Sequence, residues 1–155
     1  MKKFVLAAFA WLMATSAVQA QDNVEATVET DVVSQYIWRG MDLGHASIQP
    51  TLGVAYKGLS LSAWGSVGLT DPDDNREIDL TLSYTTGGLS VGITDYWNTE
   101  GRDPENRYFR YNAHSTNHVF EANVGYDFGP LSLQWNTIFA GNDGYNKSDK
   151  RAYSS

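Results

Sequence analysis

The sequence holds few residues whose types and spacing could support chemistry, and the densest group is the acidic run from Asp71 to Glu77. Its oxygen-bearing side chains recur at alternate positions, as they do in calcium-binding loops. The run lacks the glycine at the sixth position and the twelve-residue length of an EF-hand loop. We therefore interpret it as a solvated, turn-forming loop, and we interpret the segment from Asn142 to Asp149 in the same way.

Two histidines, His114 and His118, stand four positions apart, which is the spacing that pairs zinc ligands on a helix. The surrounding stretch has no helical period and no glutamate between the two histidines, so we expect ordinary loop histidines. No serine lies in a Gly-x-Ser-x-Gly segment, and no Ser/His/Asp arrangement stands out. The sequence thus predicts no catalytic residue, no metal site and no cofactor.

The polar and apolar residues from Val24 onward alternate with a period of two, which is typical of β-strands with one apolar face. The clearest example is residues 59–69, where Leu59 and Leu61 on one face alternate with Ser60 and Ser62 on the other. Similar segments along the chain, the first at residues 26–38, predict seven strands and the start of an eighth at Ala152.

The polar face of these strands is the candidate functional surface, because it gathers acids and amides from distant parts of the chain. In a barrel these side chains would point inward. The predicted inward set is Glu25, Glu29, Asp31, Gln35, Glu77, Asp79, Gln134 and Asn136. A wide pore lined by its acids would favour cations, whereas in a narrow barrel the same side chains would bond to one another and close it.

The connections between the predicted strands alternate between short and long. The short ones contain glycine or proline, as tight hairpin turns do. The long ones are polar and cover residues 39–47, 70–76, 98–118 and 141–151. Short periplasmic turns and longer outer loops are typical of outer-membrane barrels.

A hairpin motif recurs three times: a tyrosine, a short turn with glycine, and then Leu-Ser-Leu or Leu-Ser-Val. The tyrosine falls on the apolar face just before each turn, where an aromatic girdle would meet the membrane interface. We expect two such girdles, one at each end of the strands. Their predicted members are Tyr36, Trp38, Tyr56, Tyr84, Tyr96, Trp97, Tyr126 and Phe128.

These patterns predict an all-β fold, an antiparallel up-and-down transmembrane β-barrel formed by residues 21–155. A soluble β-sandwich whose tyrosines pack in its core is the structural alternative. Single-chain bacterial barrels close with an even number of strands, and only residues 152–155 remain for an eighth strand. We therefore expect the N-terminal portion of a longer barrel, incomplete at its C-terminus, with an eight-stranded barrel cut just short as the alternative.

Residues 1–20 have the three parts of a secretory signal peptide: Lys2 and Lys3, an apolar run, and a cleavage site after Ala20. The apolar run is shorter than the roughly 20 residues that a permanent membrane helix needs. Removal of the two lysines shifts the net charge from −7 to −9, and so acidic a chain is a poor binder of nucleic acid. The absence of cysteine excludes disulfides and a lipoprotein anchor.

The segment from Ser34 to Gly40 reads Ser-Gln-Tyr-Ile-Trp-Arg-Gly. It resembles the S-x-Y-x-W-R-G segment that opens the TorF-type porins, an uncharacterized family of Gram-negative outer-membrane proteins, and the likeness extends loosely to Phe139. The resemblance implies an outer-membrane barrel of roughly twelve strands with a porin role and no assigned catalytic or ligand residues. On physical grounds Arg39 should either reach interface water or line the pore mouth.

The expected function is passive passage of small solutes through an outer-membrane barrel, with a weak preference for cations and no catalysis. The expected partners are outer-membrane lipid, the solutes and the barrel-assembly machinery during insertion. Three alternatives stay open. They are a structural or adhesive barrel that acts through its surface loops, a barrel enzyme at the cell surface, and a secreted β-sandwich.

Overall fold

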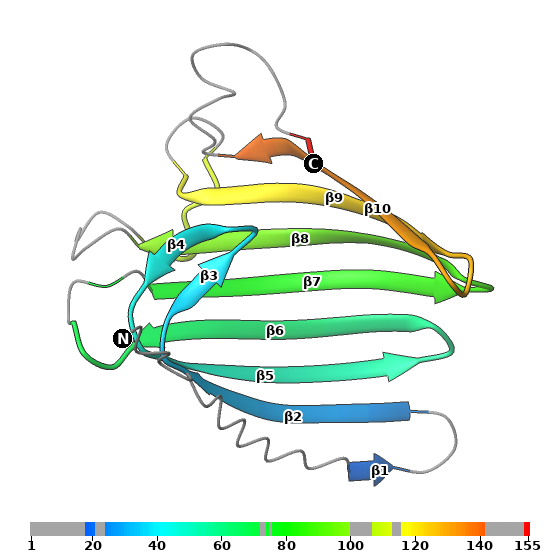
Figure 1. Ribbon diagram of the computed structural model, residues 1–155, viewed down its shortest axis with the longest axis horizontal. Helices are drawn as coiled ribbons and strands as arrows, with labels where there is room; N and C mark the ends of the chain where they lie inside the picture. Colours follow the sequence, from blue (N-terminus) through cyan, green and yellow to red (C-terminus); the bar gives the residue numbers. More distant parts are fainter. Residues whose placement is uncertain are drawn as a thin grey trace, which may run out of the picture.

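The computed structural model describes residues 18–20, 24–71, 74, 76–99, 107–112, 116–141 and 154–155, and its regular structure is entirely β (Figure 1). The strands are β1 (Val18–Ala20), β2 (Val24–Val33), β3 (Tyr36–Trp38), β4 (Met41–Gly44), β5 (Ser47–Tyr56), β6 (Leu59–Gly68), β7 (Arg76–Thr86), β8 (Leu89–Thr99), β9 (His118–Asp127) and β10 (Ser132–Gly141). The expected all-β fold is confirmed. The described residues contain no helix with the length and apolar character needed to cross a membrane.

Eight of the strands form one antiparallel sheet in the order β1-β2-β5-β6-β7-β8-β9-β10, while β3 and β4 pair only with each other. Apart from the short β1, the strands of this sheet are ten or eleven residues long. Each long strand lies beside the next long strand of the chain, so the sheet is an up-and-down meander (Figure 1). The antiparallel topology predicted from the sequence is therefore present.

The recurring turn glycines are explained by the close approach of adjacent hairpins. Gly58 and Gly88 have φ angles of 86° and 85°, as the primed two-residue turns require. Their carbonyl oxygens accept hydrogen bonds of 2.9 Å from the backbone N–H groups of Thr85 and Asp127 in the next turn. A Cβ at either glycine would overlap the carbonyl oxygen of that same neighbour. The repeated motif thus links each hairpin to the next.

Large hydrophobic side chains on the apolar face of the sheet are exposed, and the buried side chains are mostly polar. Leu52, Leu61 and Leu133 on the apolar face are 56%, 52% and 59% exposed. Among the described residues Tyr36 is the one buried hydrophobic side chain. The buried polar residues are Ser47, Gln49, Ser66, Glu77, Thr94, Thr116, His118, Glu121 and Asn136. The packed interior is therefore polar.

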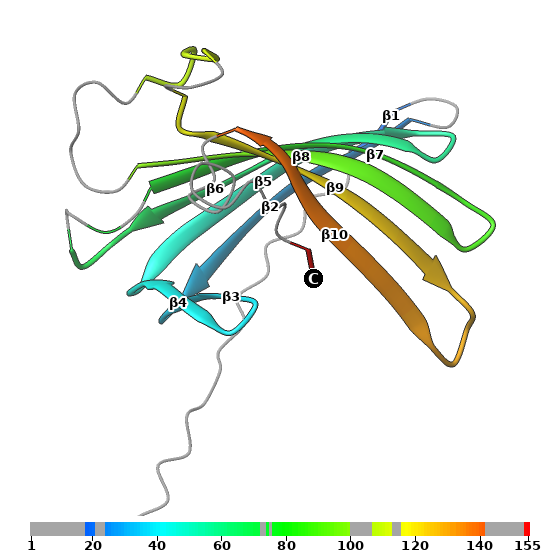
Figure 2. The same ribbon diagram turned by 90° about the horizontal axis from the view of Figure 1, so that it is seen from above.

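The first predicted strand, residues 26–38, is interrupted in the structure. The chain bends at Ser34 and Gln35, and β3 then turns back as β4 through Arg39 and Gly40, whose φ angles are 48° and 81°. These positive angles match a tight primed turn, which is why residues 39–47 do not form the long outer loop that we expected. Figure 2 shows this hairpin on one side of the sheet and residues 107–112 on the other.

The other three predicted connections start close to where β6, β8 and β10 end, at Gly68, Thr99 and Gly141, and part of each lies outside the described residues. The predicted start of an eighth strand, Ala152, falls outside the described residues. Ser154 nevertheless forms an antiparallel bridge with Thr137, and Ser155 exchanges backbone hydrogen bonds of 2.9 and 3.0 Å with Asn136. The sheet therefore continues past β10. Most of the predicted signal peptide, residues 1–17, also lies outside the described residues.

Candidate functional site

The strand register brings most of the predicted inward side chains to one face of the sheet. The residues placed there are Glu25, Glu29 and Asp31 on β2, Glu77 and Asp79 on β7, and Gln134 and Asn136 on β10. Gln35 is different, because it lies in the bend before β3 and its amide donates a hydrogen bond of 2.7 Å to Asp42. We call the surface that these strands share the polar face.

A hydrogen-bond network centred on Glu121 fills part of the polar face. The Glu121 carboxylate accepts bonds from the Tyr96 hydroxyl at 3.1 Å and from the Asn123 amide at 2.7 Å. The same Asn123 amide donates to Asn136 at 2.9 Å, and the Gln134 amide donates to Asn136 at 2.8 Å. Three strands, β8 to β10, are thus tied together through side chains as well as through their backbones.

The β3–β4 hairpin lies across the polar face, and Tyr36 anchors its beginning. The Tyr36 hydroxyl donates to Glu77 at 2.8 Å, and its ring lies 5.5 Å from the Trp64 ring, centroid to centroid. Tyr36 is 8% exposed, so the hairpin covers this part of the sheet closely.

Arg39 anchors the turn of the hairpin. Its guanidinium donates two bonds of 2.8 Å to the two oxygens of Glu121 and lies 4.3 Å from the Trp38 ring centroid. The Trp38 ring packs edge-on against Tyr96 at 6.0 Å. Arg39, which was expected either to reach interface water or to line a pore mouth, instead lies on the polar face and pairs with Glu121, an acid outside the predicted inward set.

Three of the predicted girdle residues, Tyr36, Trp38 and Tyr96, lie on the polar face, which differs from the expectation. The first two are carried there by the hairpin, and Tyr96 pairs with Asp79, whereas its neighbour Trp97 pairs with Ile78 on the apolar face. The other predicted girdle residues, Tyr56, Tyr84, Trp97, Tyr126 and Phe128, lie on the apolar face or at its turn end. There the rings of Tyr126 and Phe128 are 4.5 Å apart.

An open cavity of about 330 Å³ lies on the polar face beside the hairpin. Its lining includes Arg39, Thr81, Ser83, Thr94 and Asn123, so hydroxyl, amide and guanidinium groups all face it. Next to this wall, Asp79 pairs with Trp64 on β6 and Tyr96 on β8, and its Oδ1 is buried with no hydrogen-bond partner among the described residues. These groups could receive the polar and cationic groups of a small solute.

The acidic loop after β6 has a structural partner that the sequence did not suggest. His45 Nδ1 lies 3.0 Å from Asp74 Oδ1, and the His45 backbone N–H donates to Asp74 Oδ2 at 3.3 Å. The hydrogen bond and the charge of Asp74 raise the pKa of His45. Ligand atoms of His45, Asp71 and Asp74 lie within 4.8 Å of one another, a donor set that suits a divalent cation. The ion pair between His45 and Asp74 explains this arrangement without a bound cation.

His118 is a buried strand residue rather than the loop histidine that we expected, and His114 lies outside the described residues. The His118 side chain begins β9 on the apolar face and is fully buried. Its Nδ1 lies 2.7 Å from Asp95 Oδ1, its Nε2 bonds to the Tyr108 carbonyl, and its ring stacks on Tyr111 at 4.0 Å. Asp95 is 23 positions away, so sequence spacing gave no sign of this cluster.

The fold and the polar face define an all-β protein built on one antiparallel sheet, with a hairpin laid across its polar side. Residues 17–152 match the family described as "Bacterial protein of unknown function (Gcw_chp)", and the chain belongs to that family. No curated protein and no solved structure matches the chain. The family description assigns no function, so the resemblance to the TorF-type porins stays a prediction.

Proposed function

We propose that the chain forms the wall of an outer-membrane β-barrel through which small polar solutes pass, with a weak preference for cations. The inverted burial carries this proposal, because large aliphatic side chains cover one face while the buried groups are polar. A water-soluble sheet would hide that aliphatic face against a second layer. In an outer-membrane barrel the aliphatic face contacts lipid, so no second layer is needed to cover it.

The strand dimensions support the same placement. A tilted β-strand needs about 9–11 residues to cross the hydrocarbon layer of a bilayer. The strands from β5 to β10 are ten or eleven residues long. In lipid the open edges of such a sheet must be paired, and β10 already has a partner in Ser154 and Ser155. Export by the predicted signal peptide, with cleavage near Ala20, would deliver the chain to this membrane.

The charges of the polar face support a weak cation preference. Five predicted acids lie on this face, and the structure adds one acid, Glu121, and one cation, Arg39. The Arg39–Glu121 pair is neutral as a unit, so the five predicted acids make the electrostatic potential of the polar face negative. Fixed charges of one sign along a pore attract the opposite ion. No step in this function requires catalysis or a cofactor.

A second candidate function is a closed structural barrel that acts through its surface loops. The β3–β4 hairpin favours it, because the hairpin lies across the polar face and is bonded to both β7 and β9. If the hairpin fills the barrel completely, no continuous water path remains.

Single-channel recording of the protein refolded into planar bilayers separates the two functions. Steady conductance steps and a permeability ratio in favour of cations are expected from the pore. Silence from protein that is folded, as judged by its heat-modifiable mobility on gels, would reject the pore and favour the closed barrel.

A matched pair of variants tests the role of the acids. Asp31→Asn should lower the cation-to-anion permeability ratio, because it removes one fixed negative charge from the polar face. Ser62→Asn adds an amide to the same face without changing its charge, so it should leave the ratio unchanged. Equal ratios in both variants would show that Asp31 does not face the permeation path.

A further inference from the structure

Residues 107–112 form a short segment that lies over the apolar face, on the side of the sheet away from the β3–β4 hairpin (Figure 2). Within it the Phe109 ring is 88% exposed, more than any other large hydrophobic side chain in the described part of the chain. Two arginines, Arg107 and Arg110, flank it in the sequence. An apolar ring this exposed to solvent often marks a surface that binds a partner or a membrane.

The segment is fixed to the sheet by several contacts, most of them with the buried His118 ring. The Tyr108 carbonyl bonds to the buried His118 ring, and the Tyr108 ring packs on Trp97 at 5.4 Å. Tyr111 stacks on His118 at 4.0 Å and its hydroxyl donates to Asp95 at 3.4 Å. The backbone N–H of Arg110 donates to the Arg107 carbonyl at 3.0 Å and closes the turn between them. Phe109 is therefore held outward by an ordered platform.

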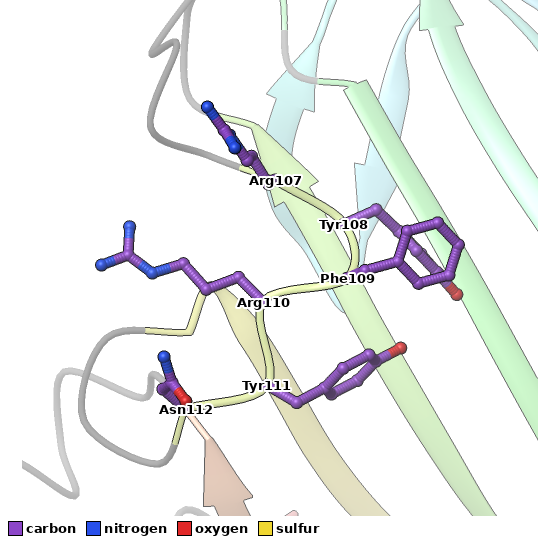
Figure 3. A pocket seen from close by; sticks show the side chains of 6 residues that line it. All are labelled: Arg107, Tyr108, Phe109, Arg110, Tyr111 and Asn112. Carbon is purple, nitrogen blue, oxygen red and sulfur yellow. The ribbon is translucent and has the colours of Figure 1, made fainter.

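The side chains of the segment are sorted by polarity. Figure 3 shows the guanidinium groups of Arg107 and Arg110 on one side of the backbone and the rings of Tyr108, Phe109 and Tyr111 on the other. The six side chains of the segment line an open hollow of about 570 Å³. At the surface of a bilayer, rings settle at the level of the headgroups and upper acyl chains, while arginines extend toward phosphate.

We propose that residues 107–112 form a lipid-binding anchor in which Phe109 enters the outer leaflet and the two arginines bind the phosphate of an anionic lipid headgroup. Guanidinium groups suit phosphate oxygens because they can donate two parallel hydrogen bonds. The segment follows β8 at the end opposite to the short turns, where the long connections lie. This inference rests on the proposed membrane barrel and adds a specific lipid partner to it.

The ring position is tested by attaching a fluorescent dye at single positions, which the absence of cysteine makes unambiguous. Phe109→Cys, Leu61→Cys on the apolar face and Ser62→Cys on the polar face are labelled in the refolded protein. The vesicles are phosphatidylcholine with bromine at defined acyl depths. We expect the bromines to quench the dye fluorescence at position 61, and the shallow bromines to quench it at position 109. The dye at position 62, on the polar face, should not be quenched. Quenching at 61 without quenching at 109 overturns the anchor alone, whereas no quenching at 61 overturns the membrane barrel as well.

The phosphate contact is tested by comparing brominated phosphatidic acid with brominated phosphatidylcholine at equal fractions in the same vesicles. The dye at position 109 should be quenched more strongly by phosphatidic acid. The change Arg107→Gln with Arg110→Gln should reduce this preference by roughly fivefold per arginine. Lys57→Gln, in a short turn at the opposite end of the strands, should preserve it. An equal preference in all three proteins would mean that the arginines do not bind the headgroup.

Discussion

Arg39 and Glu121 form a bidentate ion pair across 82 positions of the sequence, with both N–O distances at 2.8 Å. The Glu121 side chain is fully buried and the Arg39 side chain is 25% exposed. The pair fastens the turn of the β3–β4 hairpin to β9, whereas the hairpin itself follows β2 in the chain. Together with the Tyr36–Glu77 hydrogen bond, this contact holds the hairpin over the polar face.

Arg39→Gln should release the turn and widen the water path. Removing one member of the pair leaves the buried Glu121 carboxylate without its cation, which should lower the free energy of unfolding by about 1–3 kcal/mol. Single-channel conductance should rise, and the cation preference should increase, because Glu121 is no longer neutralised.

Arg39→Lys is the matched control, because it keeps the charge and loses the two parallel bonds. It should keep the ion selectivity of the original protein and only part of its stability. Unchanged conductance in Arg39→Gln would contradict the idea that the hairpin restricts the pore.

Tyr36→Phe should weaken the other anchor of the hairpin while its ring stays packed on Trp64. The Glu77 carboxylate loses the hydroxyl donor, and we expect a loss of about 1–2 kcal/mol in urea unfolding of the refolded protein. Tyr56→Phe on the exposed apolar face should change stability by less than about 0.5 kcal/mol. Equal losses in the two variants would indicate that the Tyr36 hydroxyl contributes little.

The strands were predictable from the sequence because their signal is local. Alternation in residues 59–69 or at Glu77 and Asp79 fixes which side chains share a face, and the structure places them as that period requires. The turn glycines were equally readable, since a two-residue hairpin turn needs positive φ angles, and Gly58 adopts one of 86° without a steric cost.

The contacts of the hairpin were not predictable because they join distant positions. Tyr36 and Trp38 alternate as a strand does, so the sequence suggested a continuing strand with a girdle at its end. The bend at Ser34 and Gln35, followed by the primed turn at Arg39 and Gly40, places these rings on the polar face instead. The Arg39-Gly40 pair indicated a turn locally. Nothing in the sequence around Glu121 indicated that it pairs with Arg39, which is 82 positions away.

The His45–Asp74 pair should make stability depend on pH. Contact with Asp74 raises the pKa of His45 above its ordinary value of 6.5. A raised folded-state pKa means that the pair contributes its full stability below about pH 6.5 and loses it as the pH rises through the raised value. The urea midpoint of the original protein should therefore fall across this window, and His45→Gln should remove that part of the fall. Superimposable pH profiles for the two proteins would rule out a contribution from the pair.

Gly58→Ala and Gly87→Ala separate two reasons for a turn glycine. Both positions have positive φ angles, 86° and 52°, so alanine at either should cost about 1–2 kcal/mol in backbone strain. At Gly87 an added Cβ meets nothing within 4 Å, whereas at Gly58 it overlaps the Thr85 carbonyl oxygen in the adjacent turn. Gly58→Ala should therefore be the more destabilising change in urea unfolding.

Gly58→Ala should also lower the yield of refolded, heat-modifiable protein, because the hydrogen bond from the Thr85 N–H to the Gly58 carbonyl oxygen joins neighbouring hairpins. Similar losses at the two sites would mean that turn conformation alone selects these glycines, and that the hairpins do not depend on each other through their turns.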